Sequence, residues 1–466
     1  MRGKLRTFSL VAFGAVLGIM VSLHLSAVAD TDASPSPLPI DDLRAFTDVF
    51  GKIKSDYVEP VTDKKLITEA INGMLSGLDP HSAYLDQDAF KDLQVSTQGE
   101  FGGLGIEVGM EDGFVKVVSP IEDTPAYVAG IKPGDLIIKL DDTPVKGLTL
   151  NDAVKRMRGK PNTKITLTIL RKGEVKPLVF TLTRSVIQIK SVKYRLLDPG
   201  YGYIRITQFQ EHSGEDLAKA IETLPKQNKG ALKGLVLDLR NDPGGLLNGA
   251  VAVSAAFLPK DSLVVYTDGR TEDAKMRLNA NKEYYLRPNQ SDYLKNLPEW
   301  SKTVPMVVLV NGGSASASEI VAGALKDHKR AIIMGTQTFG KGSVQTILPL
   351  GNGTAIKLTT ARYYTPNGNS IQAKGITPDI TVEDATLNEA EKLGFAVREA
   401  DLDRHLINDK EKATPPESVP LKLPAPQKNK EEKSSKPVDP ETAIKQDYQI
   451  NQAVNLLKGL QVFQRR

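Results

Sequence analysis

The sequence contains no cysteine, which excludes disulfide frameworks, thiolate zinc sites and cysteine nucleophiles. It has only five histidines, so we expect no histidine-rich metal site, and acid–base chemistry has to manage largely without imidazole. A formal net charge of +4 is too small to indicate a nucleic-acid partner. Three of these positive charges come from Arg2, Lys4 and Arg6, in a segment that we expect to be removed, so the mature chain is almost neutral.

A chain of 466 residues is longer than one ordinary domain. With 40% hydrophobic and 25% charged residues, it has the composition of a globular protein that can bury a sizeable core. We therefore expect two or more domains.

The N-terminus has the pattern of a secretory signal. The basic residues precede an apolar run from Phe8 to Leu25, and Ala27 and Ala29 supply small residues before Asp30. The alternative is a transmembrane anchor, because the apolar run approaches the about 18–20 residues that span a bilayer. We favour a signal peptide over residues 1–29; either alternative predicts that the rest of the chain is exported.

The pattern of the remaining chain changes several times. Hydrophobic residues at three- and four-residue spacing predict helices in residues 30–97. Short strands punctuated by Gly and Pro follow in residues 98–185, and apolar strands alternate with helices in residues 186–382, which is typical of an α/β core. Residues 383–440 form a variable region and a linker rich in proline and charge, and residues 441–466 predict a C-terminal amphipathic helix.

The C-terminal helix carries an apolar stripe. Its members are Ile450, Ala453, Val454, Leu457 and Leu460. The stripe is either a docking face or an oligomer contact, and we slightly favour an oligomer contact.

A glycine-rich run near residue 100 resembles the carboxylate-binding loop of a PDZ domain. Consecutive glycines let backbone amides converge on an anion, and the strand that follows can accept an extended peptide along its edge. The run consists of Phe101, Gly102, Gly103, Leu104, Gly105 and Ile106. The turn Gly130–Asp135 also resembles this family, and a short helix follows at Thr149–Arg158, opened by a capping pair. The alternative is a simple glycine hairpin; the PDZ interpretation implies recognition of a peptide C-terminus.

The segment Asn311–Glu319 follows a buried strand and opens a helix. Ser316 and Glu319 fit a Ser-x-x-Glu capping box, so a plain helix cap explains the serine locally. The same position suits a nucleophile, because the first amides of a helix can stabilise an oxyanion. The small residues around Ser316 would let a substrate backbone approach.

A nucleophilic serine needs a base, and no histidine has an evident placement for that role. His328 lies about 18 Å along the helix from Ser316, and we expect His212 and His81 to belong to turns. Lys341 is the other candidate, since it stands between two glycines after an apolar strand.

The stretch Gly335–Gly342 matches a phosphate-binding loop up to its last position. That position needs Ser or Thr to hold magnesium, and a helix must follow. Here Gly342 occupies it, and the β-branched residues and proline that follow do not predict a helix. We therefore expect no nucleotide, no metal and no other cofactor.

Several separate motifs together are similar to those of the carboxyl-terminal processing proteases, the tail-specific serine protease family. The resemblance runs from about Leu43 to Asp379. Besides the PDZ loop, it rests on Gly73–Leu75, Leu78–Ser82 (LDPHS), Asp238–Gly245 (DLRNDPGG), Ser314–Glu319 (SASASE), Gly340–Gln345 (GKGSVQ), Arg362–Pro366 (RYYTP) and Lys374–Asp379 (KGITPD). It implies a multidomain α/β protein, with a crotonase/ClpP-like α/β protease core, an inserted PDZ domain and helical N- and C-terminal segments.

The resemblance also implies roles for three residues. The family's Ser/Lys pair corresponds to Ser316 and Lys341, and its supporting glutamine to Gln345. Lowering the lysine pKa from ~10.4 to roughly 7–8 requires about 3–4 kcal/mol of differential desolvation, which this site could supply if no carboxylate lies nearby. Because four extended residues span ~13 Å, Gln345 reaches the amine only if the chain bends at Gly342 or the lysine stem runs along the strand.

Two further roles are expected. The oxyanion would be bound by the amides of Ala317 and Gly245, the latter preferred over Gly244. By analogy with the family, Arg158 would couple PDZ ligand binding to activation.

The function predicted from the sequence is that of an exported serine endopeptidase. Its PDZ domain would bind protein C-termini or unfolded tails, and a Ser/Lys dyad would cleave them through an acyl-enzyme. The expected partners are substrates with accessible C-termini, an activating adaptor and a second copy bound through the C-terminal helix, and no nucleic acid. The expected location is the periplasm of a bacterium, associated with the inner membrane if the signal is uncleaved. The alternatives are a non-catalytic PDZ adaptor and a Ser/His/Asp protease.

Overall fold

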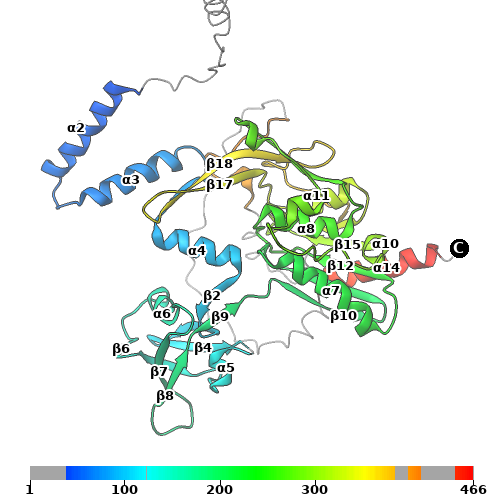
Figure 1. The fold of residues 1–466 in the computed structure, drawn as a ribbon, viewed down its shortest axis with the longest axis horizontal. Helices are drawn as coiled ribbons and strands as arrows, with labels where there is room; N and C mark the ends of the chain where they lie inside the picture. Colours follow the sequence, from blue (N-terminus) through cyan, green and yellow to red (C-terminus); the bar gives the residue numbers. More distant parts are fainter. Residues whose placement is uncertain (1–37, 122, 384–396, 411–446, 465–466) are drawn as a thin grey trace, which may run out of the picture. The chain divides into compact units, whose positions relative to one another are not determined.

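The computed structural model describes residues 38–121, 123–383, 397–410 and 447–464 (Figure 1). The chain divides into two compact units, Met1–Ala70 and Ile71–Arg466. The predicted leader, residues 1–29, lies outside the described residues. Among the helices that are described, none combines the length and the apolar character needed to cross a bilayer.

The first unit contains α2 (Ile40–Asp56) and the beginning of α3 (Asp63–Ser76). Both helices lie where the hydrophobic spacing predicts them. The helix α2 buries none of its residues, and its apolar side chains Phe46 and Val49 are 52% and 59% exposed. The apolar face that the sequence pattern predicts is therefore present on α2, but no residue of the first unit covers it.

The PDZ-like region of the second unit is a small β domain with its own core. Its elements are β3 (Ile106–Glu111), β4 (Phe114–Pro120), α5 (Pro125–Val128), β5 (Leu136–Leu140), β6 (Thr143–Pro144), α6 (Leu150–Met157), β7 (Lys164–Leu170) and β8 (Leu178–Thr183). The sheet has the order β3-β4-β5-β7-β8, so β3 is an edge strand. The predicted capping pair is present, since Thr149 and Asp152 form a capping box at the start of α6.

The centre of the second unit is a six-stranded, mainly parallel sheet. Its strands, in spatial order, are β10 (Val192–Asp198), β11 (Tyr201–Ile206), β12 (Gly234–Asp238), β15 (Met306–Val310), β16 (Ile332–Gly335) and β19 (Ile380–Thr381). Only β10 runs antiparallel to its neighbour. This confirms the α/β layer arrangement that the alternation of strands and helices predicts.

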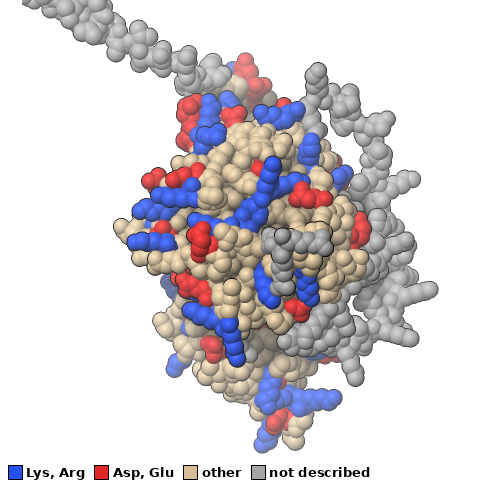
Figure 2. All heavy atoms as spheres, turned by 90° about the vertical axis from the view of Figure 1, so that its right-hand side faces the viewer, with Lys and Arg blue, Asp and Glu red and all other residues tan. Residues whose placement is uncertain are grey.

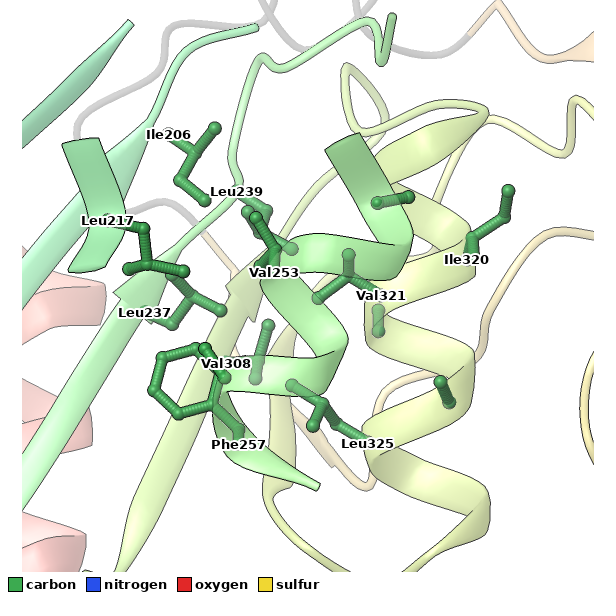
Figure 3. Close-up of a cluster of buried hydrophobic side chains, with 14 of the residues drawn as sticks. Ile206, Leu217, Leu237, Leu239, Val253, Phe257, Val308, Ile320, Val321 and Leu325 are labelled. Atoms are coloured by element: carbon green, nitrogen blue, oxygen red, sulfur yellow. The ribbon is translucent and has the colours of Figure 1, made fainter. Parts of the chain in front are cut away.

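Helices cover both faces of this sheet, because side chains alternate along each strand. Leu235 and Leu237 point to one core, together with α7 (Ser213–Asn228), α8 (Leu247–Phe257) and α11 (Ala317–Asp327). Figure 3 shows this packing, with Leu237 and Val308 of the sheet beside Phe257 and Leu325 of the helices. Val236 points to the opposite core, which α14 (Tyr448–Gln464) closes.

The second unit also contains a separate sheet, mainly built from strands that lie between those of the central sheet in the sequence. This sheet contains β1 (Ala83–Leu85), β18 (Ala355–Tyr364), β13 (Leu263–Gly269) and β14 (Arg277–Asn279), and β17 (Ser343–Pro349) also pairs with β18. The strand β1 was not foreseen, since residues 30–97 were predicted to be helical. Its three residues pair with Ala355–Lys357, so this part of the predicted helical lead belongs to the second sheet.

The remaining elements lie outside these three sheets. They are α4 (Gln87–Gln98), β2 (Glu100–Gly103), β9 (Ser185–Gln188), η1 (Glu272–Ala274), α9 (Lys282–Tyr285), α10 (Trp300–Thr303) and η2 (Glu399–Asp401). The strands β2 and β9 pair with each other at the two ends of the PDZ-like region.

The apolar stripe of α14 is docked against its own chain. Ile450, Ala453, Val454 and Leu457 are at most 6% exposed and pack on the central sheet. The preference for an oligomer contact through this stripe is therefore wrong, because these side chains already cover Tyr203, Val236, Leu309 and their neighbours. The first residues of this predicted segment, 441–446, lie outside the described residues.

A buried ion cluster joins the beginning of α14 to the loop after β12. Arg240 donates to both oxygens of Asp238, at 2.9 and 2.7 Å, and to both oxygens of Asp447, at 3.2 and 2.9 Å. It also donates to Gln449 at 2.8 Å. Since Arg240 and Asp238 are almost fully buried, pairing is required to offset the loss of hydration of their charges.

Charged groups of both signs are interspersed on the surface that Figure 2 shows, rather than gathered into a field of one sign. This agrees with the small net charge of the sequence.

The docking of α14 predicts a difference between two identical substitutions. Val454→Ala removes a side chain that is 6% exposed, whereas Val462→Ala alters one that is 63% exposed on the same helix. We expect Val454→Ala to lower the free energy of unfolding by about 2 kcal/mol, and Val462→Ala to change it by less than about 0.5 kcal/mol. Urea denaturation measures both; equal effects would contradict the docked position of the helix.

Candidate active site

Ser316 lies directly before α11, at the end of the loop that leaves β15. Its backbone has φ +55° and ψ −113°, a conformation that non-glycine residues rarely adopt. Such strain is maintained only where the surrounding structure enforces it, and it is concentrated at functional sites. The loop therefore presents this serine in an enforced geometry.

Hydrogen bonds tie this loop to the glycine turn that follows β12. The hydroxyl of Ser314 donates to the carbonyl oxygen of Leu239 at 2.7 Å. The hydroxyl of Ser318 and the amide of Ala315 both donate to the carbonyl oxygen of Asp242, at 2.8 and 3.0 Å. These contacts account for the hydroxyl groups of Ser314 and Ser318 in the SASASE motif.

The fully buried carboxylate of Glu319 joins the serine to the lysine loop. Its Oε2 accepts the backbone N–H groups of Ser316, at 2.8 Å, and of Lys341, at 2.9 Å. Its Oε1 accepts the N–H of Gly340 at 2.8 Å and the hydroxyl of Thr338 at 2.5 Å. Burial raises the pKa of Glu319 to about 7, although these hydrogen bonds favour its charged form. The sequence indicated only the capping bond; the contacts with the second loop were missed.

Lys341 is held between Gly340, with φ +100°, and Gly342, at the start of β17. Burial, with a smaller effect from Lys357, lowers the pKa of Lys341 to about 8. Three carboxylates oppose this shift, namely Glu399, Glu319 and Asp79. The expectation that the lysine needs a site without nearby carboxylates was therefore wrong, because desolvation exceeds their attraction here.

Tyr363, on β18, contacts both residues of the pair. Its hydroxyl donates to the carbonyl oxygen of Lys341 and lies in hydrogen-bonding contact with the Ser316 side chain. Burial and the proximity of Glu319 raise the pKa of this phenol well above its usual value, so it stays neutral. The RYYTP motif contained this residue, but the sequence gave no reason to bring it to the serine.

The glycine turn after β12 lies against Ser316. A methyl group on Gly244 would be 2.8 Å from both Ser316 Cβ and Ala317 N, and one on Gly245 would be 2.1 Å from the carbonyl oxygen of Phe209. The amide of Gly244 donates to Asp242 Oδ1 at 2.9 Å. The amides of Gly245 and Ala317 have no acceptor within the described part of the chain.

Among the described residues, Gln345 forms no hydrogen bond with Lys341. Its carboxamide nitrogen donates to the hydroxyls of Ser343, at 2.9 Å, and Thr359, at 3.2 Å. The pairing of β17 with β18 shifts between Val344 and Gln345, which supplies a bend in this stretch, although not at Gly342.

No histidine that the structure describes is hydrogen-bonded to Ser316. His328 contacts the carbonyl oxygen of Leu263 at 2.7 Å, and His405 contacts that of Leu402 at 2.9 Å. His212 lies near Glu100 and Glu215. His81, expected only to fix a turn, also pairs with Glu399 at 2.7 Å. A Ser/His/Asp arrangement at Ser316 is therefore not formed.

The PDZ loop has the backbone that its glycines predict. Gly105 has φ +75°, and an added methyl there would lie 2.2 Å from Thr124 Cβ. Gly102 approaches Gly159 closely, Gly103 ends β2, Leu104 is 3% exposed, and Ile106 begins the edge strand β3. The loop therefore leads directly to a free strand edge.

Arg158 lies at the end of α6 and contacts the helix α4. Its Nη1 is 3.3 Å from Asp92, and its guanidinium lies 4.9 Å from the ring centre of Phe101. The neighbouring Lys155 pairs with Asp88 at 2.7 Å. Arg158 thus connects the PDZ loop with the helix that precedes it.

The stretch that resembles a phosphate-binding loop is followed by the strand β17 and not by a helix. Two of its glycines, Gly340 and Gly342, flank Lys341. No group of acidic and histidine side chains that could hold a metal occurs among the described residues.

Comparisons with known proteins agree on the class of this protein. Sequence models match "Peptidase family S41" over residues 200–382, "PDZ domain" over residues 102–182 and "Activating protease CtpB N-terminal domain" over residues 19–89. The carboxy-terminal-processing protease of Bartonella bacilliformis is 45% identical over 446 residues, which cover 95% of each chain. The carboxy-terminal processing protease CtpA of Bacillus subtilis is 37% identical over 82% of this chain and 78% of its own length.

Among solved structures, the photosystem II D1 C-terminal processing protease is 29% identical, covering 77% of this chain and 91% of its own, with a TM-score of 0.41. The matched families define a serine-type peptidase with a PDZ domain. The chain belongs to the carboxy-terminal processing proteases of peptidase family S41.

The role of Glu319 predicts a specific loss. In Glu319→Gln, an NH₂ group replaces an oxygen that accepts backbone N–H groups, so at least one buried donor loses its acceptor. We expect the free energy of unfolding to fall by about 2 kcal/mol or more. Urea denaturation measures this change, and Glu222→Gln, an exposed change on α7, is the control. A Glu319→Gln protein as stable as the control would contradict the buried hydrogen-bond arrangement.

Proposed function

We propose that this peptidase is an exported endopeptidase that uses Ser316 as nucleophile and Lys341 as general base. The observation that carries the proposal is the largely buried lysine with a pKa lowered to about 8, in a loop bound to the same carboxylate as the Ser316 amide. A lysine must be neutral to accept a proton, and burial supplies that condition near neutral pH.

Such a pair cleaves a peptide bond in two steps, acylation of the serine and hydrolysis of the acyl-enzyme by water. Neutral Lys341 takes the proton of the Ser316 hydroxyl while Oγ attacks the scissile carbonyl, forming a tetrahedral oxyanion. As the C–N bond breaks, the lysine ammonium gives its proton to the leaving amine, and an acyl-enzyme remains. Water, deprotonated by Lys341, then attacks the ester carbonyl, and the released Ser316 oxygen regains the proton.

Two backbone amides are available for the oxyanion. We assign this role to Ala317, whose N–H begins α11, and to Gly245, rather than to Gly244, whose N–H is occupied by Asp242. Preorganised amides at this place stabilise the charge that develops in the transition state.

We assign Gln345 to the support of the lysine ammonium. Its carboxamide oxygen has no partner in the described ranges, whereas its nitrogen is fixed by Ser343 and Thr359. The oxygen is therefore the acceptor available to the protonated amine. This role needs a movement of the lysine side chain or of Gln345 during turnover.

Substrates would be selected by the PDZ domain. The glycine loop at 102–105 offers amides to a terminal carboxylate, and the free edge of β3 can pair with the extended chain that precedes it. We propose protein C-termini and unfolded tails as its ligands, and an activating partner that acts through the same domain. Arg158, in contact with Asp92, would transmit this binding to the core.

The sequence pattern of the leader supports export to the periplasm, which we include in the proposal. The domain boundaries inferred from the sequence are also part of it. They are 30–97, 98–185, 186–382, 383–440 and 441–466, with residues 83–85 added to the protease core because β1 pairs with β18. The parallel sheet with helices on both faces supports a crotonase/ClpP-like core.

The dyad predicts a particular response to a charge-conserving change. Ser316→Ala removes the nucleophile, and Lys341→Arg keeps the positive charge but provides a group that does not release its proton. We expect both variants to lose cleavage of an unfolded protein such as casein by at least about 100-fold. Lys329→Arg, an exposed change, is the matched control and should cleave normally.

The same assay has a predicted pH dependence. Because protonated Lys341 cannot act as base, kcat/KM should rise with pH and reach half of its plateau near pH 8. Retained cleavage by Lys341→Arg, or a rate independent of pH from 6 to about 9, would contradict the lysine base.

The PDZ assignment predicts that binding depends on a free carboxylate. A peptide with an apolar C-terminus should bind the full-length Ser316→Ala protein at least about tenfold more tightly than the same peptide with a C-terminal amide, since a charged hydrogen-bond acceptor is lost. Fluorescence anisotropy measures the two affinities. Equal affinities would show that the glycine loop does not bind a peptide terminus.

A further inference from the structure

Glu399 is a fully buried carboxylate that none of the steps above uses. Its two oxygens lie 2.9 and 2.7 Å from His81 Nε2. Its Oε1 also accepts a hydrogen bond from Gln372 Nε2 at 3.0 Å. A buried charge with this many directed partners indicates a constructed arrangement rather than an accidental one.

From Glu399, hydrogen bonds reach the chain on both sides of Lys341. The backbone N–H of Glu399 donates to the carbonyl oxygen of Phe339 at 3.0 Å, and Gln372 Oε1 accepts the N–H of Gly342 at 3.0 Å. Phe339 is two residues before the lysine and Gly342 directly follows it. A methyl group on Gly342 would lie 2.4 Å from the backbone nitrogen of Gln372, so the glycine permits this approach.

The other partner, His81, belongs to the turn of the LDPHS motif. Asp79 Oδ1 accepts the N–H of His81 at 2.8 Å and of Ser82 at 2.9 Å. The same oxygen accepts the hydroxyl of Thr359 at 3.1 Å, and Thr359 accepts from Gln345 at 3.2 Å. The turn therefore contacts the supports of both Gln345 and the lysine loop.

Residues 397–410, which carry Glu399, are anchored along their length. Asn408 donates to the carbonyl oxygen of Gln372 at 3.0 Å, and Asp409 accepts the hydroxyl of Tyr364. Arg404 donates to the carbonyl oxygen of Ser76, the last residue of α3, at 2.9 Å. We call residues 397–410 the strap. The strap thus joins the end of α3, through Arg404, to the loop of the proposed base, through Glu399.

We propose that Glu399 and His81 are positioning residues for Lys341, through which the strap and the LDPHS turn hold the base in place. This inference rests on the proposed Ser/Lys function. Neither residue touches the reacting atoms in the mechanism above. Their effect is exerted through Phe339, Gly342 and the electrostatic field at the amine.

The charged groups around Lys341 give the sign of the electrostatic effect. Burial and Lys357 lower the pKa of Lys341, whereas Glu399, Glu319 and Asp79 raise it. His81 faces Glu399 and lies beside Asp79, so it is the further titratable group of this cluster. Removing the charge of Glu399 removes an attraction for the ammonium, so the lysine should become neutral at a lower pH.

The test measures the rate at which a fluorophosphonate probe labels Ser316 in the full-length protein as a function of pH. In Glu399→Gln, which keeps the size of the side chain, the half-maximal rate should move to lower pH by about one unit. Asp403→Asn removes an exposed charge from the same strap and should leave the profile unchanged. A purely structural role of Glu399 would lower the labelled fraction without moving the profile.

A second pair of variants tests the positioning itself. His81→Ala removes the partner of Glu399, and we expect the plateau rate to fall by about tenfold or more because the base is displaced. His81→Gln, which retains an N–H donor, should recover part of this loss. Plateau rates and pH profiles equal to those of Asp403→Asn in all three variants would overturn the proposal. If labelling of the unaltered protein does not depend on Lys341, the proposed dyad itself fails; if it does, only the positioning role is tested.

Discussion

The hydrogen bonds of the Glu319 carboxylate hold two loops in the geometry on which the candidate site depends. One carboxylate oxygen accepts the backbone N–H groups of both Ser316 and Lys341. These residues lie 25 positions apart in the sequence, one before and one after the strand β16. Since hydrogen bonds to a buried charge are stronger than neutral ones, a single side chain can fix both the strained serine and the lysine loop. The capping function of Glu319 is thus only part of its role.

The second constraint is the burial of Lys341. An exposed lysine would be protonated and could not serve as a base at neutral pH. Here desolvation outweighs three nearby carboxylates and lowers the pKa to about 8. Those carboxylates do not abolish the effect, because Glu319 and Glu399 are engaged by backbone amides, His81 and Gln372. Polar groups therefore surround the lysine without solvating it as water would.

Local patterns predicted much of this structure. The buried strand before Asn311, the helix opened at Ser316 and the capping pair at the start of the helix after Thr149 depend on neighbours in sequence, and all three were predicted correctly. Contacts between distant segments were not predicted. Neither the pairing of β1 with β18 nor the approach of Tyr363 and Glu399 to Lys341 leaves a periodic signal. The apolar stripe of α14 was predicted correctly, but its packing on the central sheet was not, because that contact depends on the tertiary fold.

The most direct test of the account is the protonation of Lys341 itself. A ¹³C NMR titration of the lysine Cε, assigned by comparison with Lys341→Arg, reports this pKa without any substrate. The account predicts a resonance that titrates near pH 8 in the folded protein. A Lys341 resonance that titrates near ~10.4, as in a solvated lysine, would contradict the claim that the fold prepares this amine as a base.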